Sequence, residues 1–586
     1  MIRPRTVMIP PVFLALALAA PSVAQAQTMA YGDVSGGEAV SGGAGADAAG
    51  SNDSQLETFS PKKARRGGRD GRGGGKRVVI TPYIEANQIV DAELSPGSDV
   101  VTYSQAAAGL DATVAGRNNA ASVSVRYEYH YGWGKKAGNG DSISGIASGY
   151  TTIAPGLTLQ AGALATHASE RGGGAGLGGN FSRDDATVDV YAIQGGPSLV
   201  TRAGDLDVSA NYRAGFTKID THQRVRAGST VIAPDVFDKS VSQIADVEAG
   251  FAPGTVLPVG VGAAGSFYQE DVNNLDQRVR DMQARGIVTV PVGRTVQATG
   301  AIGYEDVEVS SRDAVRDASG NPVVGRNGRY VTDKSSPRRI AYDTDGLIWD
   351  VGVMWRPSPR TALTAHVGRR YGAMNYNGTF TWSPDNRRTV SLAVYDTISA
   401  FGGNLSRLLD NLPEDFVAVR NPVTGNIGGC VASLEGNNCL AGALGAIRSS
   451  TFRSRGIAAS YSMRFGRLDA GVGLGYDNRK YIAAPGTVLA IADGMTDENY
   501  WLTAYLSGQI DPRSGWGLNA YASLVKSDLD LGNVTNVGAS AAYYRNLTRH
   551  LRAHAALSID GTMASDDLLL DDFWNASALV GMRYSF

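Results

Sequence analysis

The chain lacks any apolar run long enough to cross a membrane as a helix. The run Val12–Ala20 falls short of the ~20 residues that a helical span needs, and hydrophobic residues make up only 43% of the 586. An excess of one charge is also lacking, since 54 basic residues stand against 56 acidic ones. These absences exclude a helical membrane protein and a strongly basic nucleic-acid binder.

Residues that carry chemistry are scarce as well. The chain has 2 cysteines and 6 histidines. His222, beside Asp220, is the one histidine with a suggestive neighbour, and no catalytic motif accompanies it, so a solvated loop residue is the simpler interpretation. The glycines at 172–174 lack the Lys-Ser/Thr of a phosphate-binding loop. The sequence predicts no enzyme, no cofactor and no metal site.

The first 26 residues have the three parts of an export signal. Arg3 and Arg5 give a positive start, Val12–Ala20 an apolar centre, and Ala24-Gln25-Ala26 a cleavage site of the A-x-A type. We expect residues 27–76 to follow as a disordered tail, because they are rich in Gly and Ser, then basic after Pro61, and cannot bury enough apolar surface to fold.

The basic part of this tail resembles the Arg-Gly segments that bind RNA, but a chain behind an export signal would meet little RNA. We therefore expect no nucleic-acid partner. Three interpretations remain open: a solvated tether, an electrostatic contact with anionic envelope polymers or lipid head groups, and a dock for a periplasmic protein.

From residue 77 to residue 586 the chain alternates between polar and apolar residues. Within 122–133, Tyr127 and Trp133 belong to one face, whereas Arg126, Glu128 and His130 belong to the other. A charged face opposite an aromatic face is typical of a strand that separates lipid from water. The pattern recurs at 206–217, 347–355, 457–465 and 468–476.

Short turns alternate with longer polar connections along this region. The long connections lie at roughly 171–185, 219–240, 310–345, 397–450, 482–498 and 563–572. This asymmetry is typical of an outer-membrane barrel with short periplasmic turns. The sequence thus predicts an all-β fold, a transmembrane antiparallel up-and-down β-barrel of about 22 strands, with a range of 18 to 24.

The C-terminal strand alternates up to Tyr584 and Phe586. It resembles the last strand of Gram-negative outer-membrane barrels, whose closing aromatic is read by the barrel-assembly machinery. The resemblance implies that these two residues form the insertion signal, that the protein is located in the outer membrane, and that lipid and lipopolysaccharide surround it.

The faces opposite the aromatic ones supply the expected lining of the lumen. Their charged members alternate in sign and include Arg126, Glu128, Asp207, Arg213, Arg464, Asp469 and Arg583. Mixed charge predicts cross-strand ion pairs and weak ion selectivity.

A barrel of 22 strands is roughly 45 Å across, so a segment should narrow it. The candidate is residues 399–450, where Leu405, Leu409 and their neighbours have helical spacing. Cys430 and Cys439 are expected to form a disulfide there, with free thiols or a metal pair as alternatives. The segment is interpreted either as a constriction in the mouth or as a surface lid.

Three stretches, Arg77–Tyr83, Ser144–Ala147 and Gly346–Gly352, resemble the large barrels of sphingomonad-type alphaproteobacteria. These are often labelled preprotein translocase subunit YajC. The start at Thr81-Pro82 also resembles barrels associated with exopolysaccharide and protein-sorting systems.

Two function classes follow. The first is a porin-like channel for passive or gated solute passage. The second is an occluded structural or secretion-associated barrel, for exopolysaccharide or protein translocation, that docks a partner through its basic tail. A TonB-dependent transporter also has about 22 strands but needs a folded plug, for which residues 27–76 are too few.

Overall fold

A computed structural model describes residues 77–169, 187–221, 225–227, 230–232, 239–325, 329–413, 416–433, 444, 450–528, 532–565 and 572–586. The expected export signal (1–26) and tail (27–76) lie outside the described residues. So do Cys439 and the side chain of Cys430, and the expected disulfide therefore stays a prediction.

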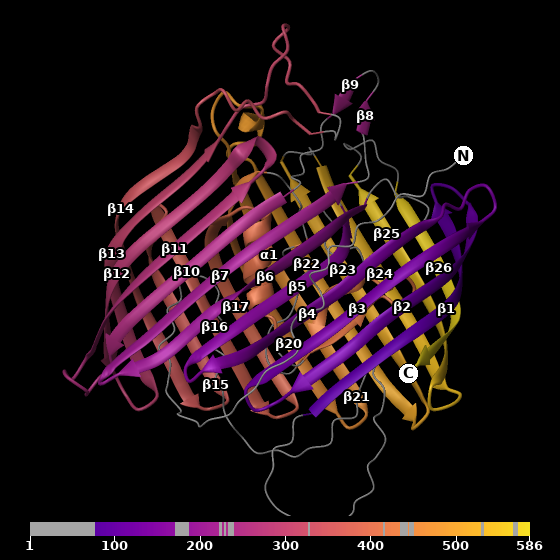
Figure 1. Ribbon diagram of the computed structural model, residues 1–586, viewed down its shortest axis with the longest axis horizontal. Coiled ribbons are helices and arrows are strands. Elements are labelled where there is room, and N and C mark those ends of the chain that lie inside the picture. Colours follow the sequence, from indigo (N-terminus) through magenta and orange to yellow (C-terminus); the bar gives the residue numbers. More distant parts are fainter. Residues whose placement is uncertain are drawn as a thin grey trace, which may run out of the picture.

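A single antiparallel sheet of 22 strands closes into a ring (Figure 1). β1 (Arg77–Ser95) pairs with β2 (Val100–Ala115) on one edge and with β26 (Phe573–Ser585) on the other. The closure runs from Tyr83 opposite Ser585 to Ser95 opposite Trp574. The predicted strand number and up-and-down topology are confirmed. A small translocase subunit with one membrane helix has no such fold, so the label that came with the resemblance is wrong for this chain.

The other strands of the ring follow in chain order. They are β3 (Asn119–Trp133), β4 (Gly140–Ala154), β5 (Leu157–Ser169), β6 (Thr187–Ala203), β7 (Leu206–Thr221), β10 (Lys239–Phe251), β11 (Gly260–Val272), β12 (Gln277–Pro291), β13 (Val296–Ser311), β14 (Arg339–Ser358), β15 (Thr361–Arg370), β16 (Ala373–Asp385), β17 (Arg388–Ser399), β20 (Thr451–Phe465), β21 (Leu468–Ile482), β22 (Thr496–Asp511), β23 (Ser514–Ser527), β24 (Gly532–Asn546) and β25 (Leu551–Ala564).

Short elements lie in the connections between the strands of the ring. β8 (Val225–Ala227) pairs with β9 (Thr230–Ile232), and β18 (Val417–Arg420) pairs with β19 (Ile427–Ala432). α1 (Phe401–Asp410) precedes the second pair, and 3-10 turns occupy Asn274–Asp276 and Val488–Ala492. None of the helices in the described part of the chain has the length and apolar character to cross a membrane.

The two ends of the barrel differ as the turn pattern predicts. One end has tight turns such as the one between β20 and β21, where Gly466 has a φ of 62° that a side chain would disfavour. The C-terminus lies at this end (Figure 1). The long connections gather at the opposite end. Short turns face the periplasm in outer-membrane barrels, so the long connections face outward from the cell.

The outside of the barrel is apolar. On β3 the residues Tyr127, Tyr129 and Trp133 are exposed, while Arg126 and Glu128, which belong to the opposite face, are buried. The last strand shows the same division, with Val580 67% exposed and Arg583 2% exposed. A closed barrel with an apolar exterior and a polar interior leaves no backbone edge in lipid. The protein is an outer-membrane β-barrel, as the sequence predicts.

Candidate functional site in the barrel lumen

The connection between β17 and β20 turns into the barrel. We call residues 400–433 the inner segment; it comprises α1, β18 and β19. α1 packs against β5, β6, β7, β10 and β17, whereas β18 and β19 contact β3 and β4. Figure 1 shows α1 between the strands of the ring. The described part of this connection lies against the inner wall, and its role as a constriction stays a prediction.

An apolar contact holds α1 on the wall. Leu405 and Leu409 are buried and lie on one face of the helix, one turn apart. They belong to one cluster with Leu164, Val190 and Ile219 of the barrel wall. The predicted helical spacing of these leucines is confirmed. Each buried leucine contributes about 1.5–3 kcal/mol, so the wall selects the helical face that points to it.

The start of α1 is capped from the wall rather than from its own sequence. Its N-cap residue, Ala400, offers no capping side chain. Glu270 on β11 takes this role: its carboxylate accepts hydrogen bonds from the backbone amides of Ala400 and Gly403, both at 2.8 Å. Ser240 also donates to Glu270, at 2.6 Å. A buried carboxylate at a helix N-terminus compensates both the free amides and the helix dipole.

The end of α1 is fixed by an ion pair with the wall. Arg213 Nε lies 2.6 Å from Asp410 Oδ1, and the arginine side chain is 7% exposed. The same guanidinium donates to the carbonyl of Pro197 at 3.1 Å and to Ser198 Oγ at 2.8 Å. A buried arginine is costly unless its donors are satisfied, and here neighbouring strands supply the acceptors.

The hairpin of β18 and β19 is fastened to β3 and β4, the wall strands next to those that carry α1. Arg420 donates to Ser144 Oγ at 2.6 Å and to Ser124 Oγ at 3.0 Å, and also to the carbonyl of Gly425 in its own turn at 2.8 Å. Gly425 has a φ of 70° and lies against Arg126 of β3. A side chain there would face both backbone strain and a clash.

Several residues predicted to line the lumen meet beneath this hairpin. Arg126 forms ion pairs with Glu85 and with Glu128, the latter at 2.9 Å. Arg583 joins the network through Glu85 at 3.5 Å and through Asp111 at 2.8 Å. All five side chains come from four adjacent strands, so the positive and negative charges compensate one another locally.

The remaining predicted residues lie elsewhere. Asp207 pairs with Arg202 at 2.6 Å and Arg464 pairs with Asp469 at 2.8 Å, in each case across a short turn. The structure thus distributes the predicted residues over separate ion pairs and does not gather them into one ring. Tyr584 and Phe586 lie on the outer face, 42% and 67% exposed, and their role in insertion stays a prediction.

Sequence reasoning missed the residues that position the inner segment. Glu270 and Arg420 lie in stretches that read only as strand or loop, and Asp410 lies among the helically spaced leucines without a sign of its partner. A second missed network joins Arg370 to Asp281 at 2.8 Å and Arg453 to Asp396 at 2.7 Å, with Tyr371 between them. The available signal was the inward apolar run Val188, Val190 and Ala192 on β6, which departs from a polar lining.

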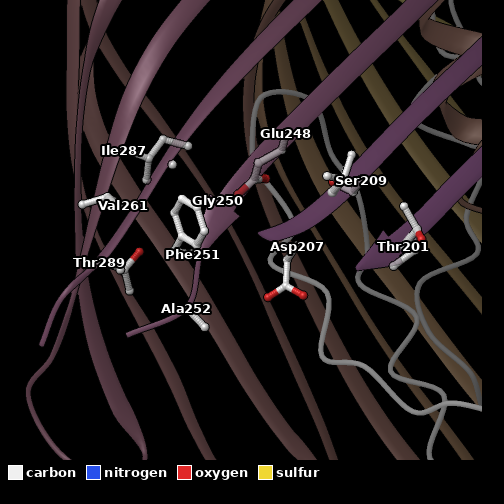
Figure 2. A pocket seen from close by; sticks show the side chains of 14 residues that line it. Thr201, Asp207, Ser209, Glu248, Gly250, Phe251, Ala252, Val261, Ile287 and Thr289 are labelled. Carbon is white, nitrogen blue, oxygen red and sulfur yellow. The ribbon is translucent and has the colours of Figure 1, made fainter. Parts of the chain in front are cut away.

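A hollow lies on the wall near the short turns (Figure 2). It is open to solvent, is bounded by β6, β7, β10, β11 and β12, and includes Asp207, Glu248 and Thr289. Gly250 of β10 pairs directly with Gly262 of β11 here, and neither glycine has a side chain to fill the hollow. Among the described residues no group of acidic, histidine or cysteine side chains could hold a metal ion.

Comparisons with known proteins give a likeness of fold. No family model and no curated protein matches the chain. Among solved structures, the FrpB iron transporter from Neisseria meningitidis is 11% identical, with 86% of this chain and 81% of that chain covered and a TM-score of 0.39. The ferric-catecholate import receptor Fiu from E. coli K12 has the same identity and coverage, with a TM-score of 0.40.

The copper transporter OprC is also similar, at 11% identity and a TM-score of 0.34, with 88% of this chain and 82% of that chain covered. At such low identity the likeness concerns the fold alone, which the strand register already establishes.

Proposed function

We propose that the protein is a gated outer-membrane channel for small solutes, and that the inner segment sets the size of solute that passes. The observation that carries this proposal is the attachment of the segment to the inside of the barrel along consecutive strands, from β3 to β11. Glu270 of β11 and Arg213 of β7 hold α1, and Ser124 of β3 and Ser144 of β4 hold the hairpin.

The dimensions favour a constriction over a seal. A ring of 22 strands is roughly 45 Å across between strand axes. A helix is about 10–12 Å wide with its side chains, and strands in a pair lie about 4.8 Å apart. The described part of the inner segment therefore narrows the lumen without matching its width.

The attachments favour a segment that moves. The anchors at Glu270, Arg213 and Arg420 are hydrogen bonds and ion pairs, which exchange with water more readily than an interlocked apolar core. One apolar cluster joins Leu405 and Leu409 of α1 to Ala418, Ile427 and Val431 of the hairpin. Displacement of the inner segment as one unit is accordingly the gating step that we propose.

The charge pattern supports passage of solutes of either sign. Arg126, Glu128, Arg583 and their partners form local pairs, and such pairs produce little net field along the lumen. The proposed channel discriminates by size more than by charge.

Single-channel recording on the full-length mature protein in a planar bilayer tests the proposal. Stepwise conductance in the wild type is expected, and a variant with residues 402–432 replaced by a short Gly-Ser linker should conduct more and admit larger solutes in a liposome-swelling assay. A correctly folded wild type without conductance would exclude the channel and favour the occluded, secretion-associated barrel.

A further inference from the structure

One sector of the inner wall differs from the rest in its chemistry. Residues paired across adjacent strands share a face. Arg583 points into the lumen, and the strand pairings carry this inner face from β26 through β25 to β24 and β23. On β23 this face comprises Gly515, Gly517, Asn519, Tyr521, Ser523 and Val525, and on β24 it comprises Val534, Asn536, Gly538, Ser540, Ala542 and Tyr544. None of these twelve positions carries an ionised side chain, whereas the sectors around Arg126 and Arg213 are dense with charge.

Aromatic rings follow one another down this uncharged sector. Trp501 lies highest on β22, Tyr521 of β23 is level with Thr503, and Tyr505 comes next on β22. Gly515 of β23 pairs with Gln509 of β22 on one side and with Tyr544 of β24 on the other. Tyr544 is therefore level with Gln509 and is the lowest ring of the series. Successive inward positions on a strand are roughly 7 Å apart. The four rings therefore form a descending series from the end with long connections towards the end with short turns.

Each ring lies over a glycine of the neighbouring strand. A Cβ at Gly475 would come within 2.6 Å of the Trp501 ring, and one at Gly538 within 2.2 Å of the Tyr521 ring. Gly471 stands in the same relation to Tyr505, and Gly515 to Tyr544. One side of each ring therefore lies against the neighbouring backbone. Because Trp501 is buried and the Arg552 guanidinium lies 4.4 Å from the centroid of the Tyr544 ring, Tyr505 and Tyr521 are the rings of the series that we expect to face the lumen. The three tyrosines are half-buried, and Trp501 is buried.

An unpartnered amide lies at the upper end of the series. Asn499 is 2% exposed and precedes Trp501 by two residues on the same face of β22. In the described residues neither its Oδ1 nor its Nδ2 has a hydrogen-bond partner. Asn519 Oδ1, opposite Tyr505, is likewise without one. A buried amide without partners destabilises the free protein, and a bound ligand with both donors and acceptors would offset that loss.

We propose that the inner face of β22, β23 and β24 binds a neutral oligosaccharide. Sugar rings present apolar C–H faces that stack on aromatic rings, and hydroxyl groups that both donate to and accept from amides. The inner faces of β23 and β24 carry no charge, and the charged groups nearest to the series already have partners: Asp560 accepts a hydrogen bond from Tyr521 at 3.3 Å, and Arg552 stacks on Tyr544. This inference rests on the proposed function, because it names the class of solute that would travel along the wall.

The test measures binding and current separately. Isothermal titration of maltohexaose, cellohexaose and isomaltohexaose into the detergent-solubilised full-length protein reports binding without any need for a pore. Current interruptions by the same sugars in a planar bilayer report passage. We expect at least one sugar to bind, and Tyr521→Ala to weaken its binding roughly tenfold. Oligogalacturonate, a charged sugar of similar size, should bind more weakly than the neutral ones.

Two further variants make the result decisive. Tyr543→Ala removes an outward-facing ring from the same strand as Tyr544 and should leave sugar binding unchanged. Asn499→Leu removes the unpartnered amide at similar volume, and should stabilise the free barrel while it weakens sugar binding. A merely structural Asn499 would not give that combination of opposite effects.

If none of the three sugars binds, the inference is wrong. It is also wrong if Tyr521→Ala and Tyr543→Ala weaken sugar binding to the same extent. If the protein conducts but binds no sugar, the proposed channel function stands and the sugar-binding surface is excluded. If it binds sugar but does not conduct, the sugar-binding surface stands and the channel function is excluded.

Discussion

Glu270 on the barrel wall caps the helix inside the barrel, through a hydrogen bond of 2.8 Å from the backbone amide of Gly403. The two residues are far apart in the sequence, and neither is recognisable as a cap on its own. The helix therefore has its start position specified by the wall. A substitution at Glu270 is therefore the most direct way to change how the inner segment is held.

Replacement of Glu270 by glutamine should loosen the inner segment. Glutamine keeps one acceptor oxygen but loses the charge that the helix N-terminus and the donors from Ser240 and Tyr268 favour. We expect a loss of about 1–3 kcal/mol in the attachment of α1, seen as noisier and larger single-channel steps. The matched control is Glu308→Gln, on the outer face of β13, which should leave the steps unchanged.

The pair of Arg213 and Asp410 predicts a coupled effect. Removal of Asp410 alone leaves Arg213 buried with part of its acceptors lost, and removal of one member of a buried pair costs about 3–5 kcal/mol. In a double-mutant cycle with Asp410→Ala and Arg213→Ala, measured by urea denaturation of the refolded barrel, we expect the double variant to cost less than the sum of the single ones. Additive costs would mean that the pair does not hold α1.

The expected disulfide between Cys430 and Cys439 predicts protection from alkylation. Mass spectrometry of protein treated with iodoacetamide should show modification of both cysteines only after reduction. Replacement of both by serine should then enlarge the solute cutoff, because the inner segment would lose a covalent restraint. Free thiols before reduction would exclude the disulfide, and an unchanged cutoff would exclude its role in the constriction.

Much of the fold could be predicted because it is encoded locally. A period of two, aromatics on one face and turn residues at regular intervals specify each strand and its two faces without knowledge of its partner. The strand number followed from counting these intervals. The face that carries Arg126 and Glu128 could be chosen for the same reason, since the opposite choice would place charges in lipid.

The position of the inner segment could not be predicted, because it depends on residues that are distant in the sequence. The leucines of α1 predict a helix but not its partner. The partner is the inward apolar group around Leu164, Val190 and Ile219, which comes from three strands. The anchors at Glu270 and Arg420 also require the register of the whole ring. The aromatic series that includes Tyr505 and Tyr521 depends on the register between β22 and β23, which the sequence alone does not give.

The C-terminal aromatics give a prediction on assembly. Tyr584 and Phe586 lie on the outer face with their ring centroids 5.2 Å apart, and Phe586 contributes little to the ring closure beyond a hydrogen bond from its amide to the carbonyl of Pro82. Deletion of Phe586 should therefore leave the refolded barrel nearly as stable in detergent, while the amount of heat-modifiable protein in the outer membrane of expressing cells falls several-fold. Ser585→Ala is the control, since its side chain points inward from the same strand. Equal loss of stability in detergent and of insertion in cells would show that Phe586 acts through the fold, and not as a signal to the assembly machinery.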